Sequence, residues 1–216
     1  LGRAAAAALV LGVLVLAGAF DWNWFKSPLE RYVSGVTGRL FAIRGDLAVD
    51  LGSVIRIDAG EVILGNAPWA SSPHLARADR VRLDVALWPL LAGRWTVPRI
   101  ELLRPDLQLE RNASGEPNWR LREPSKSRRA IRFGELVIHE GSLRLREPRQ
   151  RTDLRMQFDT EPPGPDDASS PIVAKGTGRF RNGRFQLSAR LDSPLRLLED
   201  GRGYRVEAMA QAGATR

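Results

Sequence analysis

The 216-residue sequence contains no cysteine and only two histidines, His74 and His139, which stand apart from each other. The absence of cysteine excludes disulfide bonds and thiolate-held metal ions, so the fold must rely on packing and hydrogen bonds. A glycine-rich phosphate loop and a Gly-x-Ser-x-Gly nucleophile elbow are also missing. Each isolated histidine is better explained as a structural or surface residue than as a metal ligand or base. We therefore predict neither an enzyme nor a bound cofactor or metal.

Lysine is scarce as well, because only three of the 33 basic residues are lysine, and the net charge is +8. A basic chain can bind nucleic acid or anionic lipid headgroups, but an arginine-rich solvated surface explains the same composition. Aromatic residues make up 7% of the chain and are not interleaved with the arginine-rich stretch that follows residue 120. A base-stacking platform needs such interleaving. Nucleic acid is therefore not a predicted partner, although a basic surface module remains an alternative.

The longest apolar run lies at the N-terminus, where residues 4–20 carry no charge. Seventeen helical residues span about 26 Å, close to the roughly 30 Å of a bilayer core. Trp22, Trp24 and Phe25 follow, where a membrane-interface aromatic belt is expected. We predict that residues 1–25 form a transmembrane anchor. The small residues at 17–19 also fit the cleavage site of a signal peptide, and the few flanking charges leave the orientation open.

Residues 26–38 predict a short amphipathic helix. Ser27, Pro28 and Glu30 fit a capping box with proline in the first turn. The apolar side chains expected on one face are Leu29, Tyr32, Val33 and Val36. Such a face packs either on the rest of the fold or on a membrane surface.

From Leu40 onward the apolar pattern has a period of two, which is typical of strands with one apolar and one polar face. A helical interruption is expected at residues 87–93, and Asn182-Gly183 indicates a tight hairpin turn. Residues 100–111 and 136–147 superpose at an offset of 36, including the turn residues near 105 and 141. We interpret them as two hairpins of an extended, repeating antiparallel sheet, although two amphipathic hairpins can also resemble each other by chance.

The apolar face of such a sheet needs a cover. A second sheet would give a closed sandwich, whereas a curved sheet would leave a trough for acyl chains, and the alternation alone is compatible with both. The side chains predicted to line a lipid groove are Val81, Leu83, Val85, Leu87, Ile100, Leu102, Leu107, Leu109, Leu136, Ile138, Leu143, Leu145, Phe185 and Leu187.

Several stretches together resemble the start of an AsmA-like protein, a family that includes TamB and YhdP relatives of Gram-negative envelopes. They are "GRLFAIRGDL", "GNAPW", "LLAGRW" and the turn from Gly115 to Trp119. The resemblance implies a mainly β fold with one inner-membrane helix, and an extended, curved antiparallel sheet at 39–216 that forms an open apolar groove in the periplasm. It also implies that the chain is a piece of a longer protein.

The function implied by the resemblance is transfer of phospholipid towards the outer membrane, in support of outer-membrane integrity. The implied partners are phospholipid, the inner membrane and outer-membrane or other envelope proteins. The alternative is a scaffold or assembly factor for outer-membrane proteins, built as a closed sandwich without lipid. In either case we expect Gly115 to make a hairpin turn and Trp119 to plug the end of the sheet.

Overall fold

The computed structural model describes residues 21–122, 131–164, 169–181, 183–195 and 204–212. A 3₁₀ turn, η1 (Trp22–Phe25), leads into helix α2 (Lys26–Thr37). The elements that follow are β1 (Phe41–Ile43), β2 (Leu47–Asp50), β3 (Val54–Gly65), β4 (His74–Ala86), α3 (Leu87–Leu91), β5 (Trp95–Leu103), β6 (Asp106–Glu110), β7 (Ile131–His139), β8 (Gly141–Glu147), η2 (Pro148–Gln150), β9 (Thr152–Thr160), β10 (Ile172–Phe180), β11 (Gly183–Leu191) and β12 (Val206–Ala212).

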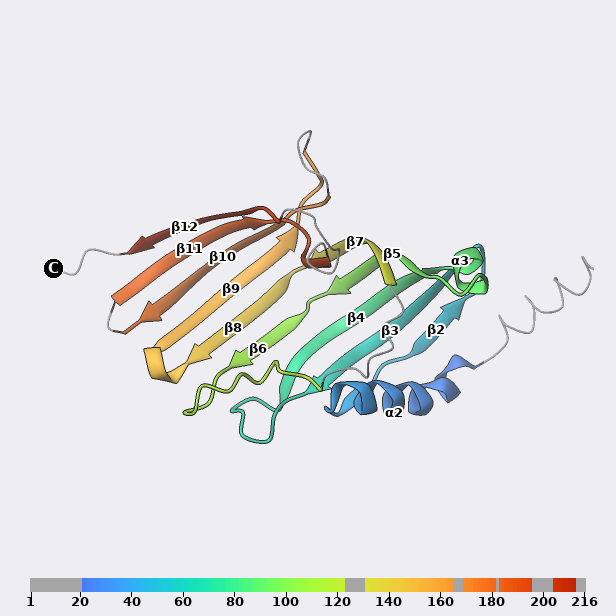
Figure 1. Cartoon of the computed structure of the whole chain (residues 1–216), viewed down its shortest axis with the longest axis horizontal. Coiled ribbons are helices and arrows are strands. Elements are labelled where there is room, and N and C mark those ends of the chain that lie inside the picture. The colour runs from blue at the N-terminus through green and yellow to red at the C-terminus, as the bar shows by residue number, and fades with distance from the viewer. Residues whose placement is uncertain (1–20, 123–130, 165–168, 182, 196–203, 213–216) are drawn as a thin grey trace, which may run out of the picture.

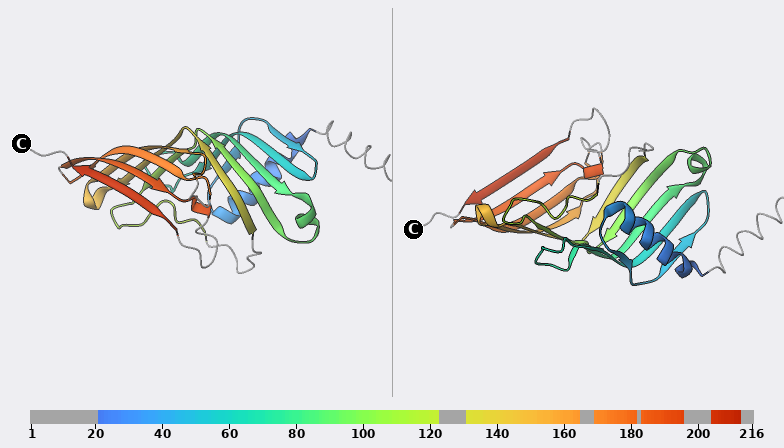
Figure 2. Two further views of the ribbon diagram at one scale, coloured as in Figure 1. Left: turned by 90° about the horizontal axis from the view of Figure 1, so that it is seen from above. Right: turned by 60° about the horizontal axis from the view of Figure 1, so that its bottom comes forward.

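The twelve strands form a single sheet. It is long, open and curved, and α2 lies across the strands of its N-terminal end (Figures 1 and 2). The described chain begins at one end of the long axis, and its last strand, β12, lies towards the other (Figure 1). The prediction of a mainly β, open, curved sheet is therefore confirmed. The closed sandwich is wrong, because no second sheet faces this one among the described residues.

The repeated segments were misinterpreted as hairpins, and this part of the antiparallel prediction is wrong. β5 and β6 both run antiparallel to β4, so β6 continues β5 in the same direction after a kink. β5 pairs with β7, and β6 with β8, in parallel and at the 36-residue offset of the repeat, as in Ile100 beside Leu136 and Leu107 beside Leu143. The other strand pairs are antiparallel. Each repeat is thus one bent strand lying beside its copy.

The kinks occur at non-glycine residues with left-handed backbones: Glu61 within β3, Arg104 between β5 and β6, and Glu140 between β7 and β8. Such a residue interrupts the regular alternation of side chains, which resumes with the opposite parity. Leu102 and Leu107 can therefore share one face of the sheet although they are five residues apart. The kinks in neighbouring strands bend the sheet together and keep its apolar side continuous.

Helix α2 packs on the sheet, as the amphipathic pattern allows. Leu29 contacts a core cluster made by Ile43, Leu47 and Ala59. The predicted capping box is wrong, because Glu30 instead accepts a hydrogen bond from the backbone N–H of Ile43 at 2.8 Å, and the helix follows directly from η1. Tyr32 and Val36 are exposed, so only part of the predicted apolar stripe faces the sheet.

The predicted transmembrane segment at residues 4–20 lies outside the described residues. Within the part of the chain that is described, no helix has the length and apolar character needed to cross a bilayer. The helical interruption is confirmed as α3. The hairpin between β10 and β11 is also present, but Phe180 pairs with Gly183, so its loop begins at Arg181 rather than at Asn182.

One face of the sheet carries charges, and we call it the charged face. In the N-terminal half of the sheet cross-strand neighbours alternate in sign, so that Asp58, Arg82 and Glu101 lie side by side on β3, β4 and β5. Arg82 contacts Asp58 at 3.1 Å and Glu101 at 3.4 Å. Half-exposed pairs of this kind add little stability individually. These charges nevertheless determine which face of the sheet stays in contact with water, because burying this face would remove the charges from water. Each buried ion would cost several kcal/mol, which is about the scale of the stability of a whole domain.

Candidate functional site

The opposite, apolar face brings the predicted groove residues together. Val81 on β4 lies beside Leu102 on β5, which lies beside Ile138 on β7. In the same way, Leu83 lies beside Ile100, and Ile100 beside Leu136. Thirteen of the fourteen predicted residues belong to strands, whereas Leu87 begins α3 instead. The register therefore places side chains from distant parts of the chain on one continuous surface.

Two parallel rows of apolar side chains cross the C-terminal half of this face. The first row runs through Leu107, Leu143, Met156, Gly176, Leu187 and Ala210. The second runs through Leu109, Leu145, Leu154, Gly178, Phe185 and Ala212. Six strands at about 4.8 Å spacing make each row about 24 Å long. One leaflet of a bilayer core is about 15 Å thick, so a row is long enough for an acyl chain.

Glycines flatten this surface. The ring of Phe158 lies over Gly141 and the ring of Phe185 over Gly178, so close that a Cβ on either glycine would fall within 2.6 Å of a ring carbon. A Cβ on Gly176 would likewise lie 2.7 Å from the side chain of Met156. Large side chains thus lie flat across neighbouring strands instead of standing away from the sheet. Met156 and Phe158 were not among the predicted groove residues, although "LRMQF" carries the same alternation.

Protein covers only part of the apolar face. Its N-terminal end is covered by α2, and Leu136 and Ile138 on β7 are buried against Ile172 and Leu195. The leucines of the two rows on β6, β8, β9 and β11 are only half-buried. The rows therefore belong to the accessible part of the apolar face.

The loop after β6 packs against the ends of these strands through Asn118, a residue that was not among the predicted site residues. Asn118 is fully buried. Its amide oxygen accepts from the backbone N–H of Glu110 at 2.9 Å, and its amide nitrogen donates to the carbonyl of Gln108 at 2.7 Å and to Asn66 at 2.9 Å. Gly115 has a φ of 88°, as expected for the predicted turn. The prediction that Trp119 plugs the end of the sheet is wrong, because Trp119 is only half-buried and stacks on the guanidinium of Arg111. The buried residue of this loop is Asn118.

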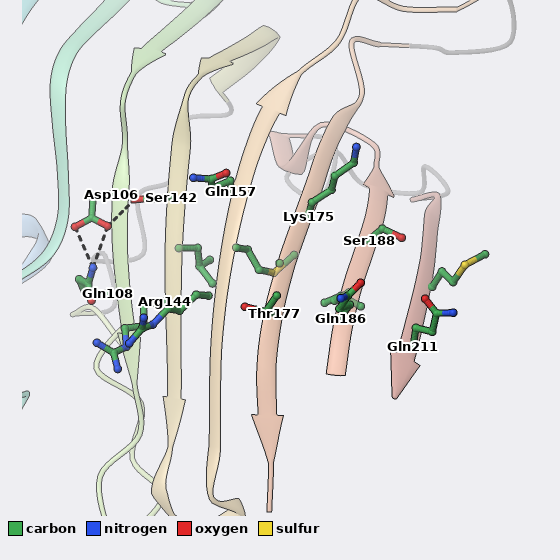
Figure 3. A pocket seen from close by; sticks show the side chains of 16 residues that line it. Asp106, Gln108, Ser142, Arg144, Gln157, Lys175, Thr177, Gln186, Ser188 and Gln211 are labelled. Atoms are coloured by element: carbon green, nitrogen blue, oxygen red, sulfur yellow. Dashed lines mark hydrogen bonds between the residues drawn. The ribbon is translucent and has the colours of Figure 1, made fainter. Parts of the chain in front are cut away.

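A hollow of about 750 Å³ lies on the other side of the same strands (Figure 3). Its polar lining residues include Gln157, Lys175, Thr177, Gln186 and Ser188, whose cross-strand register places them on the charged face. Leu143, Met156, Gly176 and Leu187 of the first row also contribute to the lining, together with Met209. Hydrocarbon in contact with these amides, hydroxyls and the ammonium would displace their water without replacing its hydrogen bonds. The two faces of the same strands thus suit different surroundings, and only the apolar one suits an acyl chain.

The sequence matches the AsmA family over residues 2–190, which is most of the chain. The protein belongs to the AsmA family. It is 25% identical to AsmA family protein YhjG of Escherichia coli K12 over 96% of this chain and 36% of that protein. It is 34% identical to Protein AsmA of the same organism over 47% of this chain and 16% of that protein. The chain thus spans about a third or less of these relatives, and no solved structure matches it.

This AsmA-family chain exposes apolar side chains at the end where its described part begins. Trp24 on η1 is 79% exposed, and Trp88 and Leu91 on α3 are 71% and 69% exposed. η1 and α3 lie at the same end of the long axis in each view (Figures 1 and 2). Tryptophan is enriched where proteins meet the membrane–water interface. Neither of these elements contributes to the two open rows, which lie in the C-terminal half of the sheet.

A carboxylate at the kinked centre of the AsmA-family sheet joins three strands. Asp106 on β6 contacts His74 of β4 at 2.8 Å and accepts hydrogen bonds from Ser142 of β8 at 2.7 Å and from Gln108. Burial by itself would raise the pKa of Asp106, but these hydrogen bonds outweigh it and hold the pKa below its ordinary value. Among the described residues no group of three or more His, Asp or Glu side chains is arranged to hold a metal ion.

The lowered pKa of Asp106 predicts a pH dependence of stability. The ionised carboxylate stabilises the fold fully above its unfolded pKa of about 3.9, and this contribution is lost as the pH falls through the lower folded pKa. We expect Asp106→Asn to lower the free energy of unfolding at pH 7. Below about pH 4 the difference in free energy of unfolding between this variant and the wild type should become smaller. Urea unfolding over a pH series measures both. A constant difference down to pH 2 would contradict the assignment.

Proposed function

We propose that this protein helps transfer phospholipid from the inner towards the outer membrane, with acyl chains lying on the open rows of its apolar face. The observation that carries the proposal is the pair of half-buried apolar rows that cross six strands of a single sheet. Soluble proteins rarely leave a continuous apolar surface of this extent without an occupant. Hydrocarbon chains match both the length and the flatness of the rows.

The energetics favour sliding over tight binding. Burying a methylene group gains about 0.8 kcal/mol, and a chain lying on one face of a sheet buries roughly half of its surface. Ten methylenes would then contribute about 4 kcal/mol, which corresponds to millimolar affinity. The rows carry no charged side chain that would hold a chain at one position. A lipid would be retained by the surface as a whole and would remain free to move along it.

Membership of the AsmA family and the uncharged segment at residues 4–20 support a single-pass anchor in the bacterial inner membrane, with the sheet in the periplasm. The exposed Trp24, Trp88 and Leu91 support the same orientation, because they gather at the end of the molecule that follows this segment in sequence. The sheet would then start at the membrane, and its open rows would lie farther along the path to the outer membrane.

The test is mass spectrometry of lipid that co-purifies with the protein. We expect phospholipid to be recovered with the protein after one rapid affinity step in a mild detergent, without extended washing, in an amount that exceeds that on an unrelated single-pass protein prepared in parallel. Equal amounts on both proteins would contradict the proposal. That outcome would instead favour a lipid-free scaffold for outer-membrane proteins.

A further inference from the structure

The arginines of the described residues differ in whether a carboxylate lies close enough to pair with them. Nine of them form ion pairs with carboxylates, mostly on the charged face. Arg149, Arg151 and Arg181 are among the described arginines that have no carboxylate oxygen within 4.0 Å, as are the exposed Arg155, Arg179 and Arg184 of the charged face. Arg149 donates to the carbonyl of Ala113, and Arg181 stacks on the ring of Phe180. No carboxylate of the described segments therefore neutralises their charges.

We call Arg149, Arg151 and Arg181 the rim arginines, and they lie along one edge of the sheet. Arg149 and Arg151 belong to the turn between β8 and β9, and Arg181 belongs to the turn between β10 and β11. The turns are neighbours because Phe180 pairs with Thr152, which pairs with Glu147. All three arginines line one hollow of about 450 Å³.

A second hollow connects the rim arginines to the apolar rows. It measures about 740 Å³ and shares Arg149 and Gln150 with the first. Its lining includes Leu109 and Leu145, which belong to the second row, as well as the half-buried Trp119. The hollow therefore leads from hydrocarbon-compatible side chains, past the ion pair between Arg111 and Glu147 at 3.1 Å, to the guanidinium of Arg149 at the strand ends.

We infer that the rim arginines bind the phosphate of a phospholipid whose acyl chains lie on the apolar rows. A guanidinium group binds phosphate through paired hydrogen bonds. Several guanidinium groups in a row allow a headgroup to move from one arginine to the next. At the strand ends the headgroup stays in water while its chains are covered. The ligand class is a glycerophospholipid, recognised by its phosphate. This inference rests on the proposed function, because it requires acyl chains on the apolar face.

The test compares two triple variants of the full chain in detergent. The first is Arg149→Gln, Arg151→Gln and Arg181→Gln. The matched control is Arg155→Gln, Arg179→Gln and Arg184→Gln, which removes three exposed arginines from the charged face of the adjoining strands β9, β10 and β11. The probes are radiolabelled phosphatidylglycerol and diacylglycerol with identical acyl chains, since only the first carries a phosphate.

We expect the rim variant to bind phosphatidylglycerol about tenfold more weakly than the wild type, because charge-assisted hydrogen bonds to phosphate are lost. Its binding of diacylglycerol should not change, which also shows that the variant is folded. The control should bind both probes as the wild type does. Wild-type affinity of the rim variant for phosphatidylglycerol, or equal weakening in both variants, would overturn the inference. If the wild type bound neither probe, the proposed function itself would fail.

Discussion

Replacing Asn118 by alanine is expected to lower the free energy of unfolding by about 3 kcal/mol. The side chain is fully buried and makes hydrogen bonds to Glu110, Gln108 and Asn66. Alanine would leave the N–H of Glu110, the carbonyl of Gln108 and the amide of Asn66 without these partners. For a chain of this size the loss corresponds to a fall in Tm of roughly 6–12 °C. Urea unfolding followed by circular dichroism measures it.

Asn112→Ala is the matched control, because Asn112 lies in the same loop and also accepts hydrogen bonds, but is more exposed to water. Water can replace its lost bonds, so the cost should stay near about 1 kcal/mol. Asn118→Asp should be as harmful as alanine, since a carboxylate cannot donate to the carbonyl of Gln108. A loss below about 1 kcal/mol for Asn118→Ala would show that the loop is held by other contacts.

The second large effect is expected from charge on the apolar rows. Leu143→Glu combined with Leu187→Glu places two carboxylates in the first row, on either side of Met156 and Gly176. An acyl chain cannot cover an ionised carboxylate without removing its water, which costs several kcal/mol. We expect the lipid that co-purifies with the protein to fall at least about tenfold. Quantitative mass spectrometry, normalised to folded protein, measures the change.

The matched control is Gln157→Glu with Ser188→Glu. These residues lie on the charged face of β9 and β11, are exposed, and give the same change in charge. We expect this variant to retain wild-type lipid. If both double variants lost lipid equally, net charge and not the apolar rows would control binding, and lipid contact with this face would be disproved.

The period-two alternation identified most of the strands and the apolar face, because the side-chain period of a strand is local. Val81, Leu83, Ile100 and Leu102 alternate with charges that would be costly to bury, so one face had to be apolar. The same local rule missed Asn118, whose polar side chain carries no apolar signal. Asn118 donates a hydrogen bond to Asn66, which is distant in sequence and is brought alongside because the beginning of β4 pairs with β6.

The 36-residue repeat was recognised but assigned the wrong geometry. Pro105 and Gly141 are typical of turns, and a turn within an alternating stretch normally reverses the chain. Here Arg104 and Glu140 adopt left-handed backbones and bend the strand without reversing it. The difference between a hairpin and a kink depends on which strand pairs with each half. β4 pairs with both β5 and β6, and this long-range pairing is not visible in the local pattern.

Local chemistry therefore defined the strands, the apolar face and the absence of disulfides, since each depends on residue type and spacing along the chain. Long-range pairing decided how the strands were assembled: one sheet instead of two, parallel repeats, a buried Asn118, and unpaired arginines gathered in the turns beside the second apolar row. These features depend on which residues become neighbours across strands. Backbone hydrogen bonds between strands are alike for nearly all residues, so an alternating pattern allows many registers, and only the packing of the whole sheet selects among them.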